Sequence, residues 1–194
     1  MTKKQTTKGK IVDAAWDLFL KKGYEETTIE DIVALSGTSK GTFYHYFNGK
    51  DSLLSSLSEI FDSYYEELYP TLDPHMHAVD KLIELSYKAH QMIGERIQLN
   101  LLASLYASQV ITRGDKHLLD QNRYYFRMVQ EVAEAGLRSG QIRQDMTVSE
   151  VVRYFSMCER SLVYDYCISN GSYDLGEYTL KLLPTMLAGI RGAN

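Results

Sequence analysis

Residues 27–53, TTIEDIVALSGTSKGTFYHYFNGKDSL, predict two short helices that are joined by a tight turn. Thr28 is suited to begin the first helix, because its hydroxyl oxygen can accept a hydrogen bond from a free N–H of the first turn. Glu30 and Asp31 suit the positive end of that helix. Gly37 is expected to end the helix, since glycine readily takes the left-handed backbone conformation. The apolar face of this helix is expected to consist of Ile29, Ile32 and Val33.

The second helix is expected over residues 40–47, with either Thr38 or Ser39 as its N-cap and Asn48-Gly49 as its end. Two helices that meet at a steep angle across a short turn containing glycine form the helix-turn-helix pattern. In that pattern the second helix enters the major groove of double-stranded DNA. We therefore expect residues 40–47 to contact DNA, with Phe43 and Phe47 facing the core.

A longer segment, residues 11–53, resembles the DNA-binding domain of the tetracycline-repressor (TetR) family of bacterial transcription regulators. The resemblance rests on an apolar helix that ends at Gly23-Tyr24, on the pair Thr27-Thr28, on GTSKGTFYHYF of residues 37–47 and on Lys50. The matching segment covers about a fifth of the chain. The resemblance implies a homodimeric repressor that leaves a palindromic operator when a small molecule binds. It also implies that the two C-terminal helices form the dimer interface and that the helix after Lys50 links the ligand site to the DNA site.

The residues expected at the DNA lie on or beside the second helix and are mostly small or hydrogen-bonding. They are Thr28, Thr38, Ser39, Lys40, Gly41, Thr42, Tyr44, His45, Tyr46 and Lys50. Because Gly41 has no side chain, the helix backbone can approach the groove closely there. The resemblance implies that Thr42, Tyr44 and Tyr46 lie near the bases or the backbone of the DNA. The resemblance also implies that Thr28, His45 and Lys50 contact mainly phosphates. For Tyr46, a packing role is expected as much as a contact with DNA.

The charge of the chain is divided unevenly between its two ends. Residues 1–50 carry eight lysines against six acids, a net +2, and the remaining 13 basic and 19 acidic side chains give −6. This asymmetry favours a DNA-binding domain at residues 1–50 and an acidic ligand-binding and dimerisation domain at residues 51–194. A lysine-rich arm is expected at residues 1–9.

Helical periodicity recurs along the whole chain, which predicts an all-α fold of about nine helices. Beyond the DNA-binding segment, helices are expected over residues 51–69, over two segments of 76–109 that meet near Gly94, and over about 117–138, 147–168 and 173–190. Thr147 and Glu150 have the spacing of a capping box. The last two helices are apolar on more than one face, which favours burial against a second copy of the chain; the alternative is a single thick core.

Several other classes of protein are not expected from the sequence. The N-terminus has no apolar signal segment and no run of about 18 apolar residues occurs, so a cytoplasmic protein without a membrane span is expected. Cys158 and Cys167 are expected to fill core space, with thiol sensing as a lesser alternative. The pair His75 and His77 is expected in a solvated loop, not at a metal. No motif of an enzyme occurs, so neither catalysis nor a cofactor or metal is expected.

A ligand pocket is expected in the body of the chain, where tyrosine is abundant. Tyr and Met side chains between helices suit an apolar or aromatic small molecule, although they equally suit a plain core. Two other functions stay open: a helical scaffold that binds protein through the helix-turn-helix, and a small enzyme that uses a cavity in the body. The candidate pocket residues are Tyr87, Tyr106, Tyr125, Met128, Phe155 and Glu159.

Overall fold

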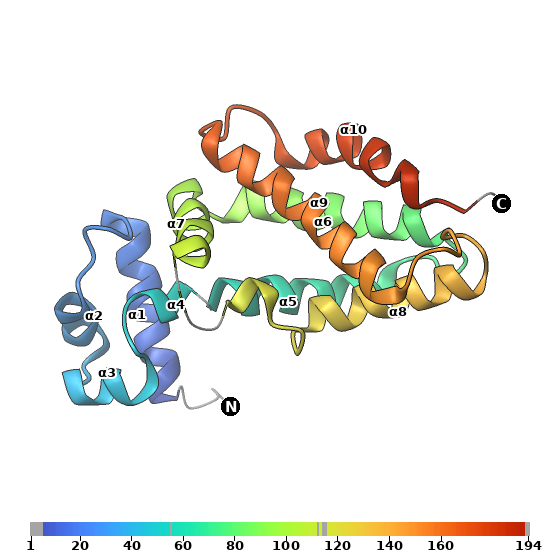
Figure 1. Ribbon diagram of the computed structural model, residues 1–194. Coiled ribbons are helices and arrows are strands. Elements are labelled where there is room, and N and C mark those ends of the chain that lie inside the picture. The colour runs from blue at the N-terminus through green and yellow to red at the C-terminus, as the bar shows by residue number, and fades with distance from the viewer. Residues whose placement is uncertain (1–5, 55, 112, 114–115, 193–194) are drawn as a thin grey trace. The chain divides into compact units, whose positions relative to one another are not determined.

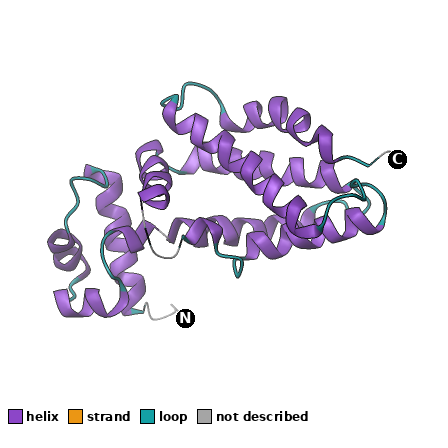
Figure 2. Cartoon of the chain, viewed as in Figure 1, coloured by secondary structure: helices purple, strands orange, loops and turns teal. Residues whose placement is uncertain are grey.

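The computed structural model describes residues 6–54, 56–111, 113 and 116–192 (Figure 1). Across these residues the regular structure is helical, as Figure 2 shows, and β structure is limited to one isolated bridge between Ile142 and Arg191. The predicted all-α fold is confirmed. In the same part of the chain, no helix is both long and apolar enough to cross a membrane.

The chain divides into two compact units. We call the first the head unit, which comprises residues 1–59 and 100–118, and the second the body unit, which comprises residues 60–99 and 119–194. The boundary between the units falls inside α5 (Ser56–Leu68). These units are defined by contacts alone, so the predicted functional boundary at residue 50 stays a prediction.

The head unit contains the predicted helix-turn-helix. Helix α1 packs against α2, and α2 packs against α3. The fully buried side chains Phe19, Ile32 and Phe43 come from these three helices, one from each. The helices that lie wholly or mainly in this unit are α1 (Thr7–Lys22), α2 (Ile29–Ser36), α3 (Lys40–Tyr46), α4 (Asp51–Leu54) and α7 (Leu99–Ile111).

The predicted start signals of α2 and α3 and the predicted end of α2 are confirmed, whereas α3 ends at Tyr46, before the predicted Asn48-Gly49. Thr28 and Asp31 form a complete capping box at the start of α2, and the Ser39 hydroxyl caps α3 by accepting a hydrogen bond from the Thr42 N–H. Gly37 has φ 64° and ψ 29°, the left-handed conformation that ends α2. Phe47, which follows the last residue of α3, is buried as predicted.

The body unit is a layered helical bundle built mainly around α6. Helix α10 packs along α6, and α8 packs against both α6 and α9. The predicted capping box of Thr147 and Glu150 is present at the start of α9. Besides most of α5, the helices of this unit are α6 (Ala78–Arg96), α8 (Tyr124–Arg138), α9 (Val148–Ile168) and α10 (Leu175–Leu187).

Several predicted boundaries are wrong. Helix α1 begins at Thr7, because Thr6 caps it, so only residues 1–5 of the predicted arm remain, and these lie outside the described residues. Gly94 lies inside α6, which continues to Arg96 before α7 begins at Leu99. The helix expected from residue 117 begins instead at Tyr124, after a short 3-10 turn at residues 117–119.

A distant side chain explains the late start of α8. The Asp62 carboxylate of α5 accepts a hydrogen bond from the Tyr125 N–H at 3.3 Å and forms a bidentate pair with Arg123, the N-cap residue. An acceptor from α5 thus satisfies a free N–H of the first turn of α8. The last helix also begins later than predicted, at Leu175, because the Asp174 side chain accepts a hydrogen bond from the Glu177 N–H.

A buried histidine joins α6 to α10. His90 Nδ1 lies 2.7 Å from Thr179 Oγ1, and the Thr179 hydroxyl donates to the Leu175 carbonyl, also at 2.7 Å. The hydroxyl has one proton, which it donates to Leu175, so it accepts from His90, and Nδ1 of the imidazole carries a proton. Burial lowers the pKa of His90 from 6.5 to about 4.

We expect this histidine to make the protein sensitive to acid. Since the folded pKa lies below the unfolded value, the unfolded chain binds a proton first as the pH falls, and stability is lost between pH 6.5 and about 4. The loss reaches about 3 kcal/mol at pH 4. His90→Asn, measured by urea unfolding across this range, should lose correspondingly less stability than the wild type. His75→Asn, in an exposed loop, is the control, and parallel losses in His90→Asn and wild type would contradict the assignment.

Candidate nucleic-acid interface

One face of α3 is exposed and the other is buried. Phe43 faces the core, where it packs in a tilted arrangement with Phe47 at 5.6 Å between ring centroids. Tyr44 is 48% exposed and Tyr46 is 42% exposed, so neither tyrosine serves mainly as packing. Lys40, Gly41 and His45 are exposed as well, and Thr42 is half-buried. The predicted residues of α3 are therefore accessible or, for Thr42, half-buried.

The hydroxyl groups at the turn before α3 are organised by short hydrogen bonds. Ser39 Oγ accepts from the Thr42 N–H at 3.0 Å and lies 2.8 Å from Thr42 Oγ1. Thr38 Oγ1 lies 2.8 Å from Ser36 Oγ, at the end of α2. These contacts fix the positions of the three predicted hydroxyl residues relative to the start of α3.

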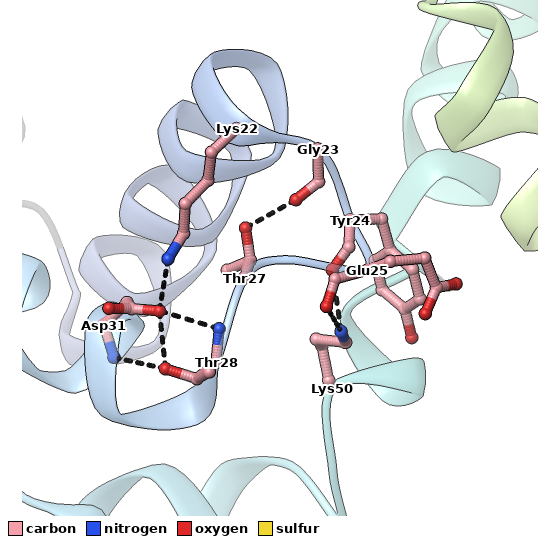
Figure 3. A network of polar contacts seen from close by, with 8 residues as sticks. All are labelled: Lys22, Gly23, Tyr24, Glu25, Thr27, Thr28, Asp31 and Lys50. Atoms are coloured by element: carbon pink, nitrogen blue, oxygen red, sulfur yellow. Dashed lines mark hydrogen bonds and ion pairs between the residues drawn. The ribbon is translucent and has the colours of Figure 1, made fainter.

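The start of α2 is closed by its own side chains. Asp31 Oδ2 accepts hydrogen bonds from the Thr28 N–H at 2.8 Å, from the Thr28 hydroxyl and from Lys22 Nζ at 2.5 Å (Figure 3). The Lys22 ammonium and the Thr28 groups hold the pKa of the Asp31 carboxyl far below its usual range. Thr28, predicted at a phosphate, thus already uses its N–H and its hydroxyl proton within the protein.

Lys50 is bound to the loop between α1 and α2. Its ammonium donates to the Tyr24 carbonyl at 2.7 Å and to the Glu25 carbonyl at 3.2 Å, as Figure 3 shows. It also lies 4.2 Å from the centroid of the Tyr24 ring. The Tyr24 hydroxyl donates to Asp51, and burial followed by this contact raises the pKa of Tyr24. The predicted phosphate contact of Lys50 stays a prediction, and one of its three donors remains for it.

Lys40 forms an ion pair across the turn. Its ammonium lies 2.5 Å from Glu30 Oε1, with side chains that are 58% and 66% exposed. This contact raises the pKa of Lys40 and lowers that of Glu30, so both groups are charged at neutral pH. The acidic first turn of α2 therefore engages a lysine on each neighbouring helix, Lys22 of α1 and Lys40 of α3.

The predicted ligand-pocket residues are divided between the two units, and the pocket stays a prediction. Tyr125 and Phe155 lie in one aromatic cluster of the body core, with Met128 in the same core. Tyr87 is half-buried on α6, and Tyr106 belongs to α7 in the head unit. The sixth candidate, Glu159, is only 6% exposed.

The buried Glu159 carboxyl is held by hydroxyl groups of three other helices. It accepts hydrogen bonds from Ser86 at 2.5 Å, from Tyr65 at 3.4 Å and from Tyr125. Burial raises the pKa of Glu159 in spite of these donors. Tyr65 and Ser86 were not among the predicted residues. Tyr65 and Ser86 lie 94 and 73 residues from Glu159 in the sequence, so no local sequence pattern indicated that they contact its carboxyl group.

Cys158 is buried and Cys167 is half-buried, and burial raises the pKa of the Cys167 thiol to about 11. A raised pKa lowers the thiolate fraction and with it the reactivity.

His77 Nδ1 accepts a hydrogen bond from the Val79 N–H and so caps α6. The part of the chain that the structure describes contains no cluster of three or more metal-ligating side chains.

Comparison with known proteins places the helix-turn-helix in a family. Residues 11–57 match the family model described as bacterial regulatory proteins, tetR family. The chain is 28% identical over 153 residues to the HTH-type transcriptional repressor KstR2 of Rhodococcus jostii, a match covering 74% of this chain and 72% of that protein. It is 22% identical over 191 residues to the fatty acid metabolism regulator protein of Bacillus subtilis, covering 98% of each.

A solved structure has the same fold across both units. The transcriptional regulator FadR from Bacillus subtilis, in complex with stearoyl-CoA, aligns with a TM-score of 0.71 at 21% sequence identity. The alignment covers 94% of this chain and 98% of that chain. Residues 11–57 therefore match the DNA-binding segment of the tetR family, and the relatives that align along most of the chain are named as transcriptional regulators.

Proposed function

We propose that this protein is a homodimeric repressor that binds a palindromic operator through α3 and leaves it when a small molecule binds to the body unit. The exposed face of α3, with its backbone accessible at Gly41, is the observation that carries the proposal. The match to the tetR family and the names of the relatives support a regulator rather than a protein-binding scaffold.

A substitution at Gly41 distinguishes an effect on DNA binding from an effect on the fold. A Cβ atom placed there would lie 3.8 Å from Ser39 Oγ, which is an ordinary van der Waals contact. Its backbone φ is not positive, so an alanine would not be strained. The protein alone therefore gives no reason for glycine at this position, whereas close approach to a DNA groove does.

The first prediction for this function concerns DNA selection by the purified full-length protein. From a random pool of duplexes the wild type should enrich a palindromic sequence. Gly41→Ala should bind that sequence about 5- to 150-fold more weakly, because an extra methyl in a close-packed contact costs about 1–3 kcal/mol. Its melting temperature should not fall, since alanine is the better helix former.

Gly94→Ala is the matched control, because Gly94 is an exposed helical glycine of α6 with open space around its Cα. It should leave DNA affinity unchanged. Failure of the wild type to enrich any sequence would contradict the proposed function. Equal affinity of Gly41→Ala and wild type would contradict only the placement of α3 in the groove.

An apolar stripe on α9 supports the proposed dimer. Met157, Tyr164 and Ile168 are 49%, 52% and 61% exposed, and their spacing of seven and four residues places them on one face of the helix. Leu180 of α10 is exposed as well. Pairing two copies has a physical motive, because two half-sites multiply affinity and specificity beyond what one short helix provides.

We expect Ile168→Glu to disrupt the dimer. A carboxylate on this stripe would lose its hydration without a partner in the interface, which strongly opposes association. Sedimentation velocity should show a monomer at concentrations where the wild type is a dimer, and affinity for the palindrome should fall at least about a hundredfold. Val110→Glu, at a 75% exposed position of α7, is the control and should remain dimeric. A fully dimeric Ile168→Glu protein would place the interface elsewhere.

The proposed effector is a long-chain acyl-CoA or a closely related acyl thioester. A relative that spans the whole chain is named as a fatty acid metabolism regulator, and the structure with the same fold was solved with stearoyl-CoA. The apolar core of the body unit, which contains Met128 and the stacked pair Tyr125 and Phe155, suits an acyl chain. An effector of this kind would release DNA by binding the DNA-free conformation more tightly.

We expect DNA release to depend on both parts of such a molecule. Fluorescence anisotropy of the bound operator should fall when stearoyl-CoA or lauroyl-CoA is added, and it should respond more weakly to acetyl-CoA. Coenzyme A alone is the control for an effect of the headgroup, and free stearate is the control for release by detergent action. If free stearate acts as strongly as stearoyl-CoA, then the thioester assignment is wrong. If no member of the series releases DNA, then the effector belongs to another class, while the DNA-binding proposal stands.

A further inference from the structure

Three lysines on or beside the predicted DNA surface have partners inside the head unit. Lys22 is paired with Asp31 and Lys40 with Glu30, while Lys50 is bound to two backbone carbonyls. Lysine ammonium groups supply the sequence-independent part of DNA affinity by replacing counterions at phosphates. Each of these lysines must therefore exchange or share an internal partner before it contacts DNA.

The Glu30–Lys40 pair is the one that DNA would most readily break. Both side chains are more than half exposed, and neither takes part in a cap or in core packing. Lys40 is the first residue of α3, next to Gly41 and Thr42 on the surface that is proposed to meet the groove. The Lys22–Asp31 pair is different, because Asp31 also closes the capping box of α2.

The Glu30 carboxylate resembles a DNA phosphate in the features that bind a lysine. It carries a full negative charge at neutral pH, and its Oε1 accepts a hydrogen bond from the Lys40 ammonium at 2.5 Å. A phosphate oxygen that approached Lys40 would compete for the same donor and would be repelled by the same carboxylate. We propose that Glu30 is an intramolecular competitor of DNA phosphates for Lys40 and so weakens binding to DNA of every sequence. This inference rests on the proposed DNA-binding function of α3.

The test measures DNA affinity of full-length variants as a function of salt. Anisotropy titrations over about 0.05–0.25 M salt would use the selected operator and a scrambled duplex. Glu30→Gln should bind both duplexes more tightly, because Lys40 is freed for a phosphate. One added contact steepens the slope of log affinity against log salt by about 0.9, which corresponds to about a fivefold gain at 0.15 M salt.

Two further variants separate this effect from a change in net charge. Glu26→Gln removes the same charge from an exposed residue of the turn before α2, and Glu26 has no lysine partner among the ion pairs of the described residues. It should gain clearly less affinity and leave the slope unchanged. In a Lys40→Met background, Glu30→Gln should change the affinity less than about twofold, because the competitor has lost the group for which it competes.

Equal gains for Glu30→Gln and Glu26→Gln, or a full gain in the absence of Lys40, would overturn the inference. So would an unchanged affinity of Glu30→Gln on both duplexes. A failure of the proposed function itself gives a different result, since the wild type would then bind the two duplexes with equal affinity. A circular dichroism spectrum and a melting curve for each variant confirm that the helix-turn-helix is intact.

Discussion

The head unit depends on how the first turn of α2 satisfies its own N–H groups. A helix begins with backbone donors that have no partner in the helix, and near a nucleic acid these donors attract phosphates. Here Thr28 and Asp31 close the turn by a reciprocal capping box, and Lys22 of α1 adds a third donor to the Asp31 carboxylate. Helix α2 is thereby fixed to α1 in the absence of DNA. Since α3 packs on α2, the position of α3 follows from the same contacts.

The pairing of lysine charges within the protein affects how strongly a regulator binds DNA. In a protein of net charge −4, lysines that are paired internally, as Lys22 and Lys40 are, add less non-specific attraction to DNA. More of its affinity must then come from contacts that only the operator offers, which are base edges and the shape of the groove. Lower total affinity also makes release easier, because a ligand can shift the equilibrium only by its own difference in affinity between the two conformations.

The sequence predicted those features that are encoded within a few residues. The N-cap of α2 at Thr28, the left-handed Gly37 and the capping box of Thr147 and Glu150 each depend on neighbours at most four positions away. Features that depend on a distant partner were missed. The start of α8 is set by Asp62, which lies 63 residues before the Tyr125 N–H that it accepts. Likewise, the two carbonyls that bind the Lys50 ammonium belong to a loop 25 and 26 residues earlier.

Helix α5 is joined to other helices of the body unit by polar contacts as well as by apolar packing. Asp62 and Tyr65, three residues apart on this helix, bind Arg123 and Glu159 in the body unit. Apolar packing tolerates small sliding movements, whereas a bidentate ion pair and a buried hydrogen bond have narrow distance and angle ranges. The Tyr65–Glu159 bond, at 3.4 Å, is longer than the Ser86–Glu159 bond at 2.5 Å. The Tyr65 hydroxyl is therefore the more distant donor to Glu159, which also accepts hydrogen bonds from Ser86 and Tyr125 of two other helices.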